Sequence, residues 1–140
     1  MSVPKPKRVE NKLEALKRTE EAVAYIIRMC QNEKCFPKRV RWTLANRLIE
    51  TGLEVILDIK EANKVKPTSK EWYQYRLDKS YEALLKIDRL WTLITLSEKT
   101  LSIPVRNLEV CSNLLYDAET IVSAWRDSDI RKFKKDYETS

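Results

Sequence analysis

A group of cations with one tryptophan, near the first break in the chain, has the side chains needed to bind phosphate and stack on a base. The stretch "FPKRVRWTLANRLIE" (residues 36–50) contains, with no acidic residue among them, Lys38, Arg39, Arg41, Trp42 and Arg47. Lysine and arginine neutralise phosphates, and an indole ring stacks on nucleobases. Apolar residues at helical spacing begin in the same stretch, although the start of a helix is already positive through its dipole. Two interpretations follow: a nucleic-acid surface, or a solvated helix start whose charges neutralise acidic faces of neighbouring subunits.

Other basic residues are weaker candidates for the same surface. Arg76 and Lys79 fall within a later predicted helix, and Lys34 precedes the Phe-Pro break. An N-terminal arm carries Lys5, Lys7 and Arg8, which would reach along a nucleic acid or simply remain disordered. We therefore extend the candidate nucleic-acid site to Arg76 and Lys79.

Catalysis and cofactor binding have little support in the residue types. The chain has no histidine, so the commonest general base is missing. Its one glycine, Gly52, lies inside a predicted helix and leaves no loop to cradle a phosphate. Glu50 and Glu54 resemble a metal pair, but they lack the Glu-x-x-His partner of bundle metal sites. We predict a protein that is not an enzyme, holds no metal or other cofactor, and exposes Glu50, Glu54, Asp58 and Glu61 to solvent.

The composition predicts one domain with a positive surface. The chain has 140 residues, a formal net charge of +6 and a pI near 9.2, which suits an anionic partner or serves solubility alone. Three cysteines at spacings unlike a zinc site, with no signal peptide, predict a reduced, cytoplasmic protein, and Cys30 and Cys111 fall on apolar stripes as core residues. The longest apolar run, residues 84–96, is interrupted by charges, so we expect no membrane span.

The periodicity of apolar residues predicts four helices. Pro37 breaks the first from the second, Thr68 or Ser69 caps the third, and Pro104 precedes the fourth. The expected organisation is a flexible basic arm over 1–8, a bundle over 9–126 and a fraying charged tail over 127–140. The first two expected helices cover residues 9–31 and 38–62. The third runs from the cap at Thr68 or Ser69 to about residue 99, and the fourth covers about 105–126.

Four helices with short connections favour an all-α, elongated, up-down-up-down four-helix bundle. The second helix carries a wide apolar stripe, and residues 84–96 are apolar on most of the helix circumference. One bundle interior cannot cover both surfaces. We therefore predict self-association into a homo-oligomer.

The second helix also resembles a known family. The stretch "FPKRVRWTLANRLIETGLEVILDIKEAN" (residues 36–63) is similar to the signature of the bacterial four-helix-bundle family that includes the accessory variability determinants of diversity-generating retroelements. Proteins encoded in ribosomal RNA intervening sequences belong to the same family. Similarity continues more loosely through "YEALLKIDRLWTLITLS" and "SAW", and covers roughly residues 12–126.

The resemblance implies a function for the basic stretch. It implies a ring-like homo-oligomer, a pentamer in the characterised relatives, with a positive surface that binds nucleic acid, RNA or DNA, and a reverse transcriptase partner in mutagenic retrohoming. The family's third helix commonly carries two arginines where this chain has Trp91 and Thr95, so that part of the site does not carry over. The alternatives are a protein-protein scaffold, or a ribosomal RNA intervening-sequence protein, without reverse transcriptase partner.

Overall fold

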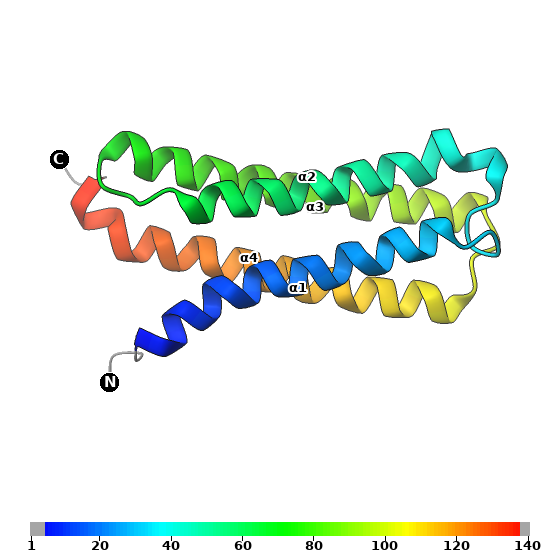
Figure 1. Cartoon of the computed structure of the whole chain (residues 1–140), viewed down its shortest axis with the longest axis horizontal. Helices are drawn as coiled ribbons and strands as arrows, with labels where there is room; N and C mark the ends of the chain where they lie inside the picture. The colour runs from blue at the N-terminus through cyan, green and yellow to red at the C-terminus, as the bar shows by residue number, and fades with distance from the viewer. Residues whose placement is uncertain (1–4, 138–140) are drawn as a thin grey trace.

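The computed structural model describes residues 5–137, with side chains over residues 14–137, and it is built from four long helices (Figure 1). No strand occurs within these residues, as the scarcity of glycine and of alternating patterns predicts. The helices are α1 (Lys5–Gln31), α2 (Asn46–Lys64), α3 (Lys70–Thr100) and α4 (Val105–Tyr137). The prediction of an all-α four-helix fold is confirmed.

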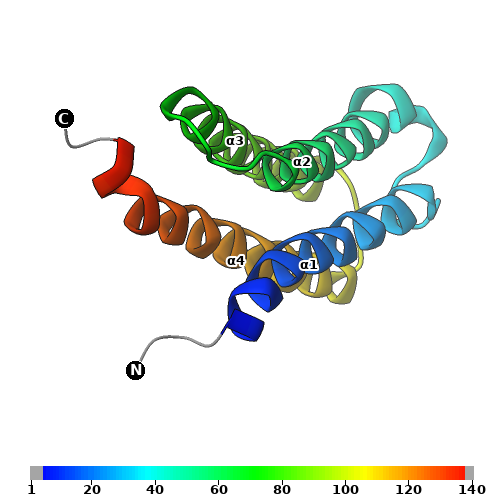
Figure 2. The same cartoon turned by 60° about the vertical axis from the view of Figure 1, so that its left-hand side comes forward.

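The helices run alternately up and down along one elongated bundle. α2 packs on α3 and α1 packs on α4, while α1–α2 and α3–α4 contacts join the two pairs. Figure 2 shows the pair of α2 and α3 lying over the pair of α1 and α4. The α1–α2 and α3–α4 connections therefore lie at one end of the bundle, and the α2–α3 connection lies at the other with the end of α4 (Figure 1).

The core runs the length of the bundle because each helix places its apolar stripe toward the others. Full burial of one large aliphatic side chain contributes about 1.5–3 kcal/mol. All four helices contribute large, fully buried aliphatic side chains, among them Val23 and Ile26, Leu48 and Ile59, Ile87 and Leu90, and Leu115 and Val122. Gly52 lets α2 approach α1 closely, since a Cβ atom there would lie 2.9 Å from Cγ1 of Val23.

The start of α3 follows the predicted cap. Ser69 has extended backbone angles, and its Oγ accepts a hydrogen bond from the amide of Trp72 (3.2 Å). This bond satisfies one of the amides that have no partner within the first helical turn. The local sequence therefore sets where α3 begins.

Both ends of the predicted bundle extend further than the sequence indicates. α1 begins at Lys5, so its backbone includes residues 5–8, which were assigned to a flexible arm; Pro6 fits there because the first helical turn needs no amide donor at that position. Residues 1–4 lie outside the described part of the chain.

The prediction of a fraying tail is wrong for residues 127–137. α4 continues to Tyr137, and its last turns pack on α3 through Asp129, Phe133 and Tyr137. Tyr137 Oη donates a hydrogen bond to the Pro67 carbonyl at 2.6 Å. These contacts bind segments far apart in the sequence, and a local reading of "RKFKK" cannot show them.

Several large apolar side chains remain on the surface. Leu53 and Leu57, one turn apart on the outward side of α2, are exposed, as are Leu85 and Leu96 on α3. The surplus apolar surface predicted for these two helices is therefore present in the single chain. In the part of the chain that the structure describes, no helix combines the length and apolar character needed to cross a membrane.

Candidate nucleic-acid interface

The α1–α2 connection holds the basic stretch through inward-facing apolar residues. The amides of Cys35 and Phe36 both donate to the Asn32 carbonyl (2.9 Å each), and the side chains of Cys35 and Phe36 are buried. Asn32 Oδ1 accepts a further bond from the Lys34 amide (3.0 Å). The turn is thus fixed from the inside, and the charged residues that follow project outward.

The second helix does not begin as one regular α-helix at Lys38, as was predicted. A 3-10 turn covers Lys38–Val40, a π-helical turn covers Arg41–Ala45, and α2 proper begins at Asn46. The amide of Asn46 bonds back five residues to the Arg41 carbonyl. Apolar spacing does not reveal this change, because the three helical forms differ by less than one residue per turn between neighbouring types.

The start of this helical segment concentrates positive potential. Neither the 3-10 turn nor the π turn has an acidic residue in its first turn or a side-chain cap. The partial positive charge of the helix start therefore adds to that of the lysine and arginine side chains. Backbone amides and cations together make such a position suitable for an anion.

The helix-start cluster, defined here as Lys38, Arg39, Arg41 and Arg47, is exposed to solvent. Among the described side chains it makes one ion pair, from Lys38 Nζ to Glu33 Oε1 at 3.6 Å. Both partners of this pair are exposed, so the pair is weak. Trp42 lies within the cluster with 79% of its surface exposed. The cluster and Trp42 are therefore accessible to solvent.

A hollow of about 320 Å³ lies beside the cluster and is large enough for part of a ligand. Its rim includes Lys38 and Arg41, together with the carboxylate of Glu33. Phe36, Ala45 and Ile49 line its apolar side. The cations and apolar lining suit a nucleotide, while Glu33 works against a phosphate bound directly next to it.

Arg76 is not part of this interface, and its assignment as a nucleic-acid ligand is corrected. The side chain is 3% exposed and forms a fork with Asp129, with Nε–Oδ2 at 2.6 Å and the second nitrogen, Nη2, 3.1 Å from Oδ1. Nη1 donates to the Val65 carbonyl (3.1 Å), and the guanidinium lies 5.6 Å from the centre of the Trp125 ring. Arg76 joins α3, α4 and the α2–α3 connection from inside the bundle.

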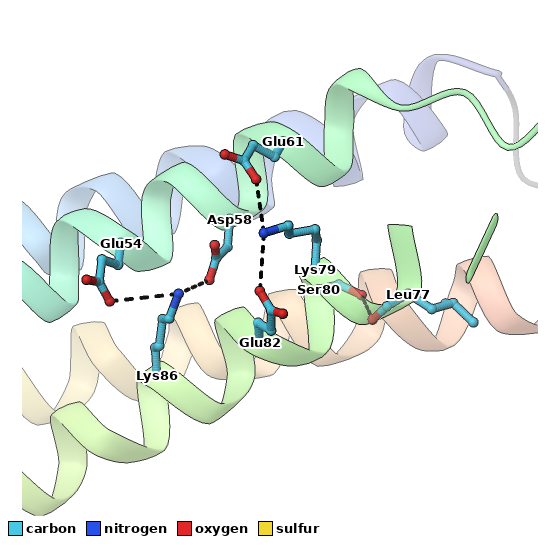
Figure 3. Close-up of polar contacts among 8 residues, drawn as sticks. All are labelled: Glu54, Asp58, Glu61, Leu77, Lys79, Ser80, Glu82 and Lys86. Carbon is cyan, nitrogen blue, oxygen red and sulfur yellow. Dashed lines mark hydrogen bonds and ion pairs between the residues drawn. The ribbon is translucent and has the colours of Figure 1, made fainter. Parts of the chain in front are cut away.

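Lys79 is likewise turned into the protein. Figure 3 shows its Nζ between the carboxylates of Glu61 on α2 and Glu82 on α3, at 3.2 and 3.3 Å. Hydrogen bonds to Glu61, the larger contribution, and to Glu82 raise the pKa of Lys79 above its usual value. The ammonium group is therefore neutralised by its own chain, and its prediction as a phosphate ligand is not supported by this geometry.

The prediction of a solvated acidic row on α2 is wrong at Asp58. Asp58 is buried, with 6% of its surface exposed, and accepts a hydrogen bond from Lys86 Nζ (2.7 Å). Glu54 approaches the same ammonium group at 3.8 Å (Figure 3). Glu50, Glu54 and Glu61 are exposed as predicted, although Glu54 and Glu61 also pair with lysines of α3. Sequence reasoning missed the partners Lys86 and Asp129. Lys86 lies 28 residues from Asp58, and Asp129 lies 53 residues from Arg76, so no local pattern indicates either ion pair.

The described side chains include no candidate metal site, and the buried thiols are unreactive near neutral pH. No group of three or more histidine, cysteine, aspartate or glutamate side chains in residues 14–137 is arranged to hold a metal ion. Burial raises the pKa of Cys30 and of Cys111 to about 12, so both thiols stay neutral near pH 7 and are poor nucleophiles. Both residues belong to the core as predicted.

The positions at which the resembled family carries arginines have a different role here. Trp91 is half-buried and packs against the core. Thr95 is exposed, but it has no charge to offer a phosphate. Any nucleic-acid binding by this chain must therefore depend on other cations, of which the helix-start cluster is the densest predicted group.

Comparisons of the chain with protein-family models, with curated proteins and with solved structures find no match.

Proposed function

We propose that this chain is a non-enzymatic accessory protein that binds nucleic acid through the helix-start cluster. The observation that carries the proposal is the exposure of Lys38, Arg39, Arg41 and Arg47 around the accessible ring of Trp42. The cations would contact phosphates, and the indole ring would stack on an unpaired base. Contacts of this kind do not depend on base sequence.

Self-association strengthens such a surface. Leu53 and Leu57 on α2, and Leu85 and Leu96 on α3, leave apolar area uncovered, which supports a homo-oligomer, five-fold by the resemblance. Rotational symmetry would repeat the helix-start cluster once per subunit, and linked weak sites bind one long partner far more tightly than a single site does.

The biological setting of the proposal is taken from the family resemblance of residues 36–63. In that setting the protein assists a reverse transcriptase during mutagenic retrohoming of a diversity-generating retroelement, with RNA or its DNA copy as the bound nucleic acid. The alternative is a scaffold or a ribosomal RNA intervening-sequence protein without that partner. The cluster would then meet an acidic protein surface, which displaces few condensed counterions.

The test compares two double variants that each remove two positive charges. Arg39→Gln with Arg41→Gln changes the cluster, and Lys17→Gln with Arg89→Gln changes exposed cations in the middle of α1 and α3 that form no ion pair among the described residues. Binding of one structured RNA and one single strand is measured over a range of salt concentrations. The slope of the logarithm of the binding constant against the logarithm of the salt concentration should decrease in magnitude by up to about 2 in the cluster variant. Each phosphate contact contributes roughly 0.7–0.9 to this slope.

An equal slope in the cluster variant, the control and the parent would contradict the proposal. Light scattering after size exclusion, on the same preparations, gives the mass of the assembly. A monomer at micromolar concentration would contradict the oligomer, whereas a multiple of the chain mass that survives the cluster substitutions would support it.

A further inference from the structure

The end of the bundle opposite the helix-start cluster carries a second group of exposed cations. One part extends from the last residue of α2 through the α2–α3 connection to the first residue of α3, and the other is the last turns of α4. Figure 1 shows these two segments at the same end of the molecule. All seven side chains are exposed: Lys64, Lys66 and Lys70, and Arg131, Lys132, Lys134 and Lys135. We call this group the far-end cluster.

Specific contacts hold the two parts of the far-end cluster together. Tyr137 Oη bonds to the Pro67 carbonyl, and the Tyr137 ring stacks on Tyr73 with centroids 5.3 Å apart. Arg76 contacts both the Val65 carbonyl and Asp129 of α4. The cations are therefore carried by segments that tertiary contacts fix in place, which reduces the conformational entropy lost when a partner binds.

The positive charge of this end exceeds what its surroundings neutralise. Glu71 and Asp136 are the acidic residues within residues 64–71 and 131–137. The C-termini of α2 and α4 add the equivalent of roughly half a negative charge each. Within the described side chains, Lys64, Lys66, Arg131 and Lys134 form no ion pair. Helix-dipole compensation therefore explains only part of the cluster.

The apolar residues nearby favour nucleic acid over a lipid surface as the partner. Membrane-surface helices need an outward apolar face to insert, but Phe133 and Tyr137 contact Tyr73 inside the bundle. Trp72, two residues after Lys70, is 51% exposed and offers a flat ring beside the cations. Basic side chains next to an accessible aromatic ring are the pattern that binds a phosphate backbone and its bases.

The two basic clusters are separate surfaces. Between them α2 spans 19 residues, which corresponds to about 28 Å at 1.5 Å per residue. Over that length Lys79 and Lys86 are paired with carboxylates of α2 (Figure 3). These two cations between the ends of the bundle are thus neutralised by carboxylates of the chain itself.

We propose that the far-end cluster is a second phosphate-binding surface, so that the two ends of the bundle hold two segments of nucleic acid. The proposal rests on the proposed function for the part played by the helix-start cluster. The expected consequence is that the protein tethers one strand to another that is not complementary to it.

The test uses Lys66→Gln with Lys134→Gln, which removes one charge from each part of the far-end cluster. The full chain, this variant, Arg39→Gln with Arg41→Gln, and the mid-bundle control Lys17→Gln with Arg89→Gln are compared. Salt slopes are measured with a single-stranded RNA, and tethering is measured as capture of a labelled RNA by a second, immobilised RNA of unrelated sequence. In the far-end variant the magnitude of the salt slope should decrease by up to about 2. The amount of labelled RNA captured by the immobilised RNA should fall to a small fraction of that captured by the parent.

Each result separates this proposal from the previous one. A far-end variant whose slope and capture equal those of the control overturns the second surface, whatever the other variant does. A slope lowered by the far-end change but not by the Arg39 and Arg41 changes overturns the function proposed for the helix-start cluster and supports the far-end surface. Binding to vesicles of phosphatidylserine and phosphatidylcholine that the far-end variant loses, with RNA binding unchanged, assigns the cluster to a membrane and overturns the proposal. Circular dichroism on every variant verifies that the helices are intact.

Discussion

The cations inside the bundle and those at the start of α2 are the same residue types with opposite roles. Arg76 and Lys86 are held by Asp129 and Asp58, and these pairs connect α3 to α4 and to α2. Arg39 and Arg41 are exposed and have no carboxylate partner among the described side chains. The difference shows that a cation's availability to a ligand depends on whether the fold brings a carboxylate to it.

The largest effect is expected from removing a buried partner. Asp129→Ala should lower the free energy of unfolding by about 3–5 kcal/mol, because it leaves the guanidinium of Arg76 buried without its counter-charge. Asp127→Ala removes an exposed carboxylate two residues earlier and should change stability by no more than about 0.5 kcal/mol. Urea unfolding followed by circular dichroism gives both values. Equal losses in the two variants would show that the Arg76–Asp129 pair does not hold α4 in place.

An intermediate effect is expected at Lys86. Lys86→Met should cost about 1–3 kcal/mol, because the buried carboxylate of Asp58 loses its 2.7 Å partner. Glu54→Gln is the matched change on the exposed side of the same ammonium group, where the distance is 3.8 Å, and should cost about 0.5 kcal/mol or less. If Glu54→Gln were as costly as Lys86→Met, the importance of burial at this site would be refuted.

The smallest change in the free energy of unfolding is expected for substitutions in the helix-start cluster, and there the change should be zero or stabilising. Arg39→Gln with Arg41→Gln should leave stability unchanged or raise it, by at most about 0.3–1 kcal/mol per charge, since these cations oppose the positive start of the helix. Lys64 lies in the last turn of α2, where its positive charge interacts favourably with the partial negative charge of the helix C-terminus. Lys64→Gln should therefore lower the free energy of unfolding by a similar amount. Urea midpoints for the two variants would measure the contrast. A substantial loss in the Arg39 and Arg41 variant would assign the cluster a structural role.

The resemblance and the geometry support the candidate site to different extents. Exposure of Lys38, Arg39, Arg41, Trp42 and Arg47 follows the sequence prediction, because the Phe-Pro break buries Phe36 and turns the following polar residues outward. Nucleic-acid binding, the reverse transcriptase partner and the pentamer stay predictions. Arg76 and Lys79 leave the site, since their partners lie on other turns and other helices.

The far-end cluster shows how a local pattern can be misjudged. "RKFKK" has few apolar residues, which predicts a frayed tail. In the structure Phe133 and Tyr137 contact Tyr73 and Pro67, and together with the Asp129–Arg76 pair they hold the end of α4 on α3. The surface they contact is formed by α3 and its preceding connection, 60 to 70 residues earlier in the chain, so no window around the tail contains it.

The sequence by itself determined the helical class, the breaks around Pro37 and Pro104, and a cap at Thr68 or Ser69. These features depend on backbone and side-chain preferences within a few residues, so they can be read from spacing and residue type. Tertiary structure alone decided which charges are neutralised: Asp129 lies 53 residues from Arg76, and Lys86 lies 28 residues from Asp58. Spacing places a residue on a face of its helix, but whether that face meets a carboxylate, a core or water depends on how the helices pack.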